Sequence, residues 1–101
     1  MGQLLILQNN DEICRTHYLY YHTYTDDGKK ISSAKYGIVN IFYTNFIYIC
    51  GIEDNILRQI IGKKFDLLLN DNKGTKKYIK CTLNNVSGND YEFTYESIIE
   101  Y

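Results

Sequence analysis

The stretch Tyr36–Ile52, YGIVNIFYTNFIYICGI, is the longest apolar run in the chain. It contains no Asp, Glu, Lys or Arg, and β-branched and aromatic residues dominate it, as is typical of strands. Its length of about 17 residues falls just short of a membrane span, and polar residues interrupt it. We therefore expect buried β structure that other elements cover, and no membrane partner.

The triplet Tyr43-Thr44-Asn45 predicts a tight turn inside this run, because Asn tolerates left-handed backbone geometry. The turn would divide the run into strands over 36–43 and 46–52, forming the central hairpin of the fold. One continuous strand is the alternative, but it would be much longer than most strands.

Composition places the chain among single globular domains. It has 101 residues, 45% of them hydrophobic and 23% charged, so we expect one domain over 1–101. The net charge of −1 argues against a surface tuned as a whole for nucleic acid. The odd, scattered set of Cys14, Cys50 and Cys81 favours a reducing compartment, and the N-terminus lacks a basic signal-peptide region. We expect a cytoplasmic protein.

Before the apolar run, the sequence predicts a strand over 3–8 and a long strand over 13–25. Tyr18, Tyr20, His22 and Tyr24 would share one face of this long strand. The turn Asp26-Asp27-Gly28-Lys29 is a strong hairpin signal, so residues 17–25 should pair with a strand that starts near Lys30.

After the run, Ile56, Leu57, Ile60 and Ile61 recur at helical spacing. Asp54 or Asn55 can cap the start of this helix and Gly62 can follow its end. The remaining segments are predicted as strands over 63–70, 75–84 and 91–95, a turn at 71–74, a loop at 84–89, and a last strand or helical turn at 97–101. The predicted fold class is mainly β (α+β), a small antiparallel sheet or barrel of six to eight strands with one short helix near 54–61.

The order of elements from residue 54 onward resembles a known architecture. A short helix ending in IIGKK leads into FDLLL, a turn, YIKCTL, a loop and YEFTY. This order is similar to that of SH3-like barrels, including Sm-like modules. The resemblance implies a small barrel over 54–101 and carries over no binding residue, since such barrels serve many functions.

Candidate catalytic and metal-ligating residues form no complete motif. Cys14, His17 and His22 are the one Cys/His cluster, but on a strand Cys14 and His17 would point to opposite faces. Cys14 as a thiol nucleophile is the enzyme alternative, although nothing in the sequence marks an activated thiol. We expect no metal, no cofactor and no enzymatic activity.

One cluster of lysines offers a nucleic-acid hypothesis. In this hypothesis Tyr78 stacks on a base and nearby lysines contact phosphate groups. The lysines are Lys63, Lys64, Lys73, Lys76, Lys77 and Lys80. The competing interpretation is a solvated hairpin whose lysines block edge-to-edge pairing. The sequence favours the second interpretation and leaves nucleic-acid binding as an alternative.

The tyrosines offer the leading hypothesis, a non-enzymatic protein-binding module. The chain has eleven tyrosines, and Tyr is enriched at protein interfaces. The expected contact residues are Tyr18, Tyr20, Tyr21 and Tyr24, and a homodimer is a further expectation. The abundance of Ile, Asn, Lys and Tyr is associated with AT-rich coding sequence and favours a phage or mobile-element inhibitor of a host defence protein.

Overall fold

The protein is an antiparallel β structure with one short helix among the residues that the structure describes. The computed structural model describes residues 2–25, 37–42, 52–88 and 90–101. Its elements, in chain order, are β1 (Gly2–Gln8), β2 (Asp11–Tyr18), β3 (Tyr20–Thr25), β4 (Gly37–Phe42), α1 (Asp54–Ile60), β5 (Phe65–Asp71), β6 (Gly74–Ser87), β7 (Asp90–Tyr95) and β8 (Ser97–Glu100).

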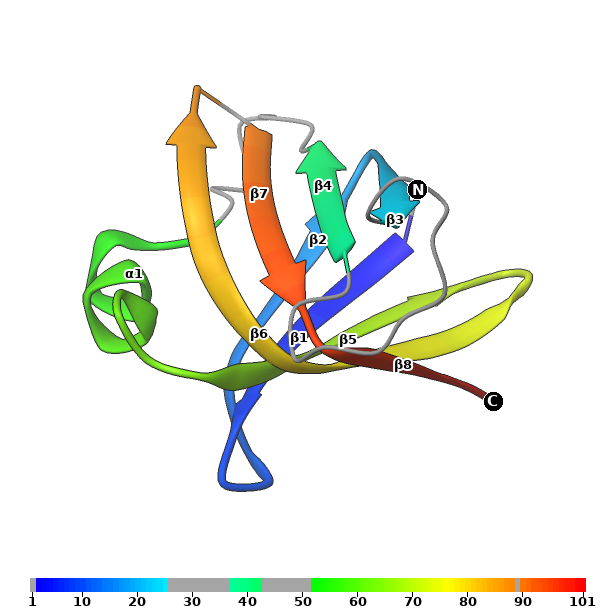
Figure 1. The fold of residues 1–101 in the computed structure, drawn as a ribbon, viewed down its shortest axis with the longest axis horizontal. Helices are drawn as coiled ribbons and strands as arrows, with labels where there is room; N and C mark the ends of the chain where they lie inside the picture. The colour runs from blue at the N-terminus through cyan, green and yellow to red at the C-terminus, as the bar shows by residue number, and fades with distance from the viewer. Residues whose placement is uncertain (1, 26–36, 43–51, 89) are drawn as a thin grey trace.

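The eight strands form one open sheet that bends into two layers. The path β2-β1-β5-β6-β7-β4-β3 runs through the sheet, and β8 pairs with β6 beside it. The first half of β6 pairs with β5 and β8, and its second half pairs with β7. We call β2, β1, β5, β8 and the first half of β6 the first layer. The second layer consists of the second half of β6 with β7, β4 and β3 (Figure 1).

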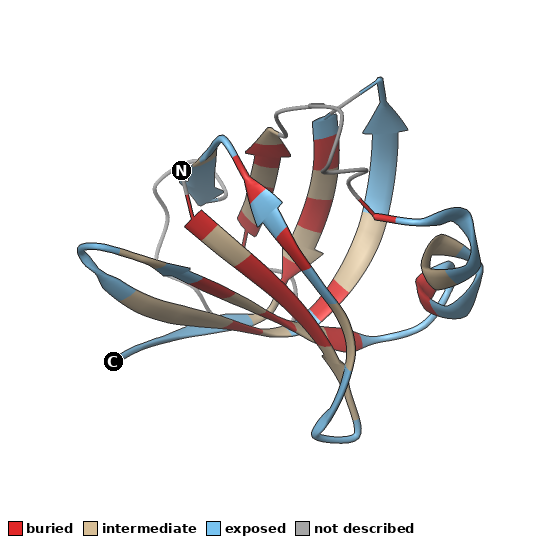
Figure 2. Ribbon diagram, turned by 180° about the vertical axis from the view of Figure 1, so that it is seen from behind, coloured by how far each residue is buried: buried red, intermediate tan, exposed pale blue. Residues whose placement is uncertain are grey.

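The core lies between the two layers. Alternate residues of β4 and β7 point into it, so that Val39, Ile41 and Phe93 are fully buried. Figure 2 shows the buried positions of the first layer as bands along its strands. The helix α1 lies at one end of the layers, where its fully buried Ile60 packs against the core (Figure 1).

The bend of β6 centres on Lys80. This residue has a φ of 53°, a left-handed backbone conformation that is uncommon for residues other than Gly and Asn. The Lys80 amide donates a hydrogen bond of 3.1 Å to Oδ1 of Asp66 on β5. Tyr78 and Cys81 are both buried although they stand three apart, which a regular strand does not allow. A bulge therefore lets β6 turn from one layer into the other.

The predicted fold class is confirmed, and the helix lies close to its predicted position. It ends before Gly62, whose φ of 73° suits the residue that follows a helix. Two details were wrong. Glu53 rather than Asp54 or Asn55 occupies the N-cap, and Ile61 is 60% exposed because the helix ends before reaching it.

Most of the later strands were predicted with shifted ends. The strand over 91–95 and the turn at 71–74 are confirmed, and the last segment forms a strand, β8, over Ser97–Glu100. The strand expected over 63–70 begins at Phe65 instead. The loop expected at 84–89 was wrong over 84–87, because β6 continues to Ser87 in its pairing with β7.

The predicted single strand over 13–25 was wrong. It is two strands, β2 and β3, separated by a bend at Leu19. These strands stand at the two ends of the sheet path, so the chain passes from the first layer to the second at this bend. A straight strand of that length would leave the second layer without its last strand.

The pairing predicted around the apolar run was partly wrong. β3 does lie beside the start of the run, but Thr25 pairs with Gly37 rather than with a residue near Lys30. β4 confirms the strand over 36–43, and its two edges are occupied by β3 and β7. The second strand of the expected central hairpin, 46–52, lies outside the described residues except for Ile52. The turns expected at 26–29 and 43–45 lie outside the described residues.

Candidate functional site

The bend at Leu19 separates the four tyrosines that the sequence grouped as a binding surface. Tyr18 is only 2% exposed and belongs to the core, so its assignment to the surface was wrong. Its hydroxyl donates a 3.4 Å hydrogen bond to Asp71, and burial is the main cause that raises its pKa. Tyr21 is half-buried on the inner side of β3, with its ring 5.5 Å from that of Tyr18.

Tyr20 and Tyr24 lie on the opposite, outer side of β3. They are 48% and 52% exposed, and the exposed His22 stands between them. The Tyr20 ring stacks on Phe42 of β4 at 4.5 Å between centroids and 21° between planes. The His22 ring contacts Tyr20 at 5.4 Å and Phe42 at 5.6 Å. We call Tyr20, His22, Tyr24 and Phe42 the aromatic row.

The aromatic row is one side of a larger outer face. The strand register aligns Tyr20 with Phe42, Asp90 and Ser87 across β3, β4, β7 and β6. The neighbouring alignment, equally on the outer side, is His22, Asn40, Glu92 and Asn85. Directly opposed residues have Cβ atoms about 5 Å apart. The face therefore places aromatic rings next to carboxylates and amides.

A groove lies where these two alignments cross β4, β7 and β6. Its volume is about 140 Å³, and the described residues that line it are Asn40, Phe42, Asn85, Ser87, Asp90 and Glu92. The Asn84 amide donates a hydrogen bond to Glu92. In the described part of the chain, neither Asp90 nor Glu92 has a Lys or Arg within ion-pair distance. Among the described residues, the groove thus carries two carboxylates without a countercharge.

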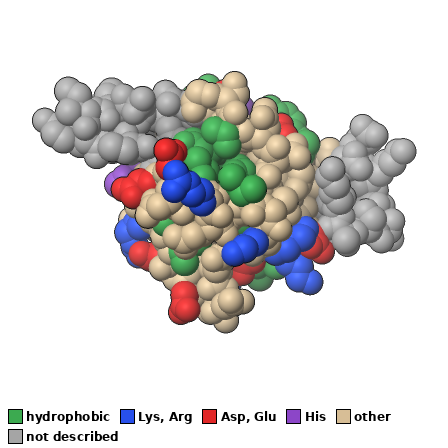
Figure 3. Space-filling view, turned by 90° about the vertical axis from the view of Figure 1, so that its left-hand side faces the viewer, with side chains coloured by type: hydrophobic (Ala, Val, Ile, Leu, Met, Phe, Trp, Pro, Cys, Tyr) green, Lys and Arg blue, Asp and Glu red, His purple; other side chains and the backbone are tan. Residues whose placement is uncertain are grey.

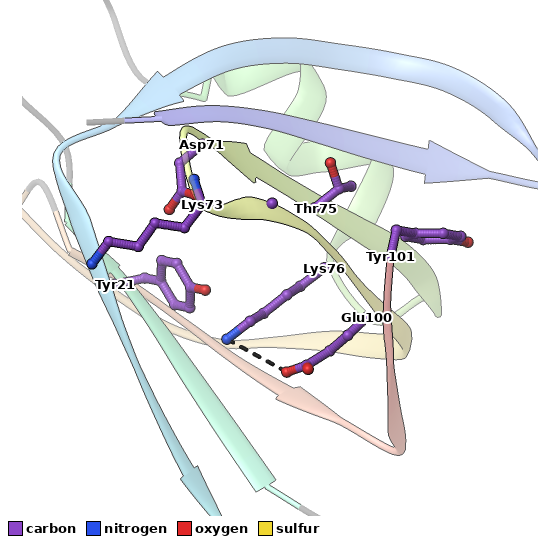
Figure 4. Close-up of a pocket in the computed structure, with 8 residues that line it drawn as sticks. Tyr21, Asp71, Lys73, Thr75, Lys76, Glu100 and Tyr101 are labelled. Atoms are coloured by element: carbon purple, nitrogen blue, oxygen red, sulfur yellow. Dashed lines mark hydrogen bonds and ion pairs between the residues drawn. The ribbon is translucent and has the colours of Figure 1, made fainter.

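Tyr21 borders a second pocket of about 150 Å³ between β3, the turn after β5 and the end of β8, which we call the inner pocket. Figure 4 shows Lys76 reaching between Tyr21 and Glu100. Its amine lies 5.7 Å from the centroid of the Tyr21 ring and 3.6 Å from the Glu100 carboxylate. A hydrogen bond with Tyr21 is the main cause that raises the pKa of Lys76. Within this pocket, Lys76 and Glu100 neutralise each other's charge.

The six lysines of the nucleic-acid hypothesis do not form one patch. Lys76 lines the inner pocket, whereas its neighbour Lys77 forms an ion pair of 3.7 Å with Asp66. Lys64 forms an ion pair of 3.6 Å with Glu96. Lys80 contributes its backbone conformation to the bend of β6, as described above. The exposed Lys63 and Lys73 complete the set.

On the face that carries α1, basic side chains likewise lie among acidic ones, as Figure 3 shows. Nucleic-acid binding stays a prediction.

Cys14 lies in surroundings opposite to those that activate a thiol. It packs against the core from β2, and burial raises the pKa of its thiol to about 11, with further contributions from Glu53 and Glu12. His17 is exposed, on the other face of β2, as predicted. His22 belongs to the aromatic row. The described residues contain no group of three or more His, Cys, Asp or Glu side chains placed to hold a metal ion.

Sequence reasoning missed Phe42, Asp90 and Glu92 as members of the candidate site. Their positions on the outer face follow from strand pairings between segments about 50 residues apart, which the local pattern does not encode. The alternation of Tyr91, Phe93 and Tyr95 was the one available signal, because it places Glu92 outside.

Within the described part of the chain, no helix is long and apolar enough to cross a membrane. Comparisons with protein-family models, curated proteins and solved structures find no match to this chain.

Proposed function

We propose that this chain is a small non-enzymatic protein-binding module whose contact surface is the aromatic row. The observation that carries the proposal is the pair of half-exposed tyrosines, Tyr20 and Tyr24, on one side of β3. Tyrosine supplies a large contact area and loses little side-chain entropy on binding. The stacked Tyr20–Phe42 pair already restricts one of these rings, which reduces the cost further.

The position of β3 in the sheet supports the same proposal. Of the described strands, only β4 pairs with β3. A strand at the end of a sheet presents backbone N–H and C=O groups that a partner strand can pair with. A partner that extends the second layer would add backbone hydrogen bonds to the contacts of the aromatic row.

The nature of the partner is proposed from composition. The abundance of Ile, Asn, Lys and Tyr favours a phage or mobile-element origin, and an inhibitor of a host defence protein is the form of binding module that we propose. A second copy of the chain, giving a homodimer through β3, is part of the same proposal. The likeness of residues 54–101 to SH3-like barrels remains a proposal about architecture and assigns no contact residue.

The test compares single alanine substitutions in a capture experiment on extract of the host. Tyr20→Ala and Tyr24→Ala should lose the partner that the unchanged protein retains, and should weaken its purified complex about tenfold or more, as expected for central aromatic contacts. Tyr101→Ala is the matched control, because Tyr101 is 73% exposed and lies outside the outer face. Sedimentation analysis of the same proteins tests whether the chain forms a homodimer and whether each substitution disrupts it.

Equal capture by all four proteins would contradict the proposal. Loss of capture by Tyr101→Ala alone would also contradict it, since the binding surface would then lie near the inner pocket. Far-ultraviolet circular dichroism of each variant establishes that the sheet is intact.

A further inference from the structure

We infer that the groove beside the aromatic row binds an arginine side chain of the partner. The inference rests on the proposed function, because it assigns part of the same outer face to a chemically defined group. It concerns Asp90 and Glu92, which the aromatic row does not include, and the ring of Phe42, which belongs to both.

The geometry of the groove suits a planar cation. Phe42 and Asp90 are direct register partners, as are Asn40 and Glu92. Asp90 and Glu92 stand two residues apart on β7, or about 6.6 Å along the strand. A guanidinium group offers five N–H donors in a rigid plane and stacks on aromatic rings. One group can therefore lie against Phe42 while it donates to a carboxylate beside the ring.

The charge of the groove selects the sign of the ligand. The two aligned sets of outer residues described above contain no Lys or Arg, and they contain both Asp90 and Glu92. A neutral or acidic partner covering this face would remove water from both carboxylates without pairing them, which is costly. A basic partner gains two charge-assisted hydrogen-bond acceptors instead.

The size of the groove selects one side chain rather than a segment of chain. Its volume of about 140 Å³ lies below the roughly 300–1,000 Å³ of pockets that hold a whole small ligand. Amide oxygens of Asn40 and Asn85 at its sides can accept further N–H groups. Lysine offers a compact ammonium that cannot stack in the same way, so arginine is the preferred ligand.

The experiment is a titration of the ¹⁵N-labelled protein with N-acetyl-L-arginine amide, followed by amide chemical shifts. We expect saturable shifts at Phe42, Asp90 and Glu92 with a Kd on the order of 1–10 mM, as is reasonable for a single side chain. N-acetyl-L-glutamine amide should leave these signals in place, and the lysine analogue should bind more weakly. Glu92→Gln and Asp90→Asn should each weaken arginine binding about fivefold or more.

Glu100→Gln is the matched control, because Glu100 lies in the inner pocket beside Lys76. It should leave arginine binding unchanged. Absence of saturable shifts in the groove, equal shifts with the glutamine analogue, or undiminished binding by both groove variants would each overturn the inference.

The two proposals fail in different ways. If Tyr20→Ala abolishes partner capture but arginine does not bind, the proposed function stands and the arginine groove does not. If arginine binds in the groove but both tyrosine variants capture the partner normally, the groove stands and the aromatic row is not the partner's surface.

Discussion

Replacement of Asp66 by alanine should destabilise the protein by weakening the bend of β6. The Asp66 carboxylate accepts the backbone amide of Lys80 at 3.1 Å and lies 3.7 Å from the amine of Lys77. Lys80 holds a positive φ of 53°, a conformation that costs a non-glycine residue about 1 kcal/mol or more. The hydrogen bond from Asp66 helps to offset this cost in the folded state.

The expected loss is about 2 kcal/mol. A hydrogen bond to a charged acceptor contributes about 1.5–3 kcal/mol, and we take the low end because the Asp66 side chain is 26% exposed. A partly exposed ion pair adds at most about 1 kcal/mol. For a domain of this size, 2 kcal/mol lowers Tm by roughly 8–16 °C.

The assay is reversible urea unfolding followed by circular dichroism, with thermal unfolding as a second measure. Asp66→Asn keeps an oxygen acceptor for the Lys80 amide and should cost about 1 kcal/mol or less. Lys77→Ala removes only the ion pair and should cost less than about 1 kcal/mol. The reasoning is refuted if Asp66→Ala unfolds within about 0.5 kcal/mol of the unchanged protein, or no earlier than Lys77→Ala.

Three further predictions concern buried groups. Gly37→Ala should destabilise by about 2 kcal/mol or more in urea unfolding, because its Cβ would lie 2.4 Å from the Tyr24 carbonyl oxygen; a loss below about 0.5 kcal/mol would contradict this. Tyr78→Phe removes a hydroxyl that hydrogen bonds at 3.1 Å and should cost about 1 kcal/mol. Tyr95→Phe removes a buried hydroxyl that has no hydrogen-bond partner among the described residues and should be neutral or stabilising, so equal losses in the two variants would argue against this account. The Cys14 thiol, whose pKa is raised from 9.0 to about 11, carries less thiolate below pH 11 than a free thiol, and its alkylation at pH 8 should be about a hundredfold slower, measured by mass spectrometry of its peptide; a rate near that of free cysteine would contradict the burial.

Local patterns predicted those parts of the fold that depend on neighbours in sequence. The turn at 71–74 is confirmed because its Gly74 adopts a positive φ of 145° and Asp71 accepts the Lys73 amide at 2.8 Å. The end of the helix is confirmed because Gly62, which follows it, adopts the positive φ that glycine accommodates. Alternation predicted that Phe93 points inward. Each of these features is fixed by interactions within a few residues.

The candidate site could be predicted only in part. The sequence identified Tyr20 and Tyr24 as candidate contacts because one strand cannot bury tyrosines on both faces. It grouped them with Tyr18, which is buried, and it omitted Phe42. Stacking of Tyr20 on Phe42 requires β3 and β4 to pair in one register, and that register is not the one that the turn signal at 26–29 favours.

The run Tyr36–Ile52 and the strand-rich segments around it determined by themselves that the chain is mainly β, since β-branched and aromatic residues are enriched in strands; the helical spacing of Ile56, Leu57 and Ile60 determined the one short helix. Only the tertiary structure decided which tyrosines reach the surface. The chain must cross from one layer to the other at Leu19, and this bend changes the alternation, so Tyr18 points into the core while Tyr20 points outward. A shift of one residue reverses every side chain that follows it, and the two-layer packing, not the local sequence, sets where that shift occurs.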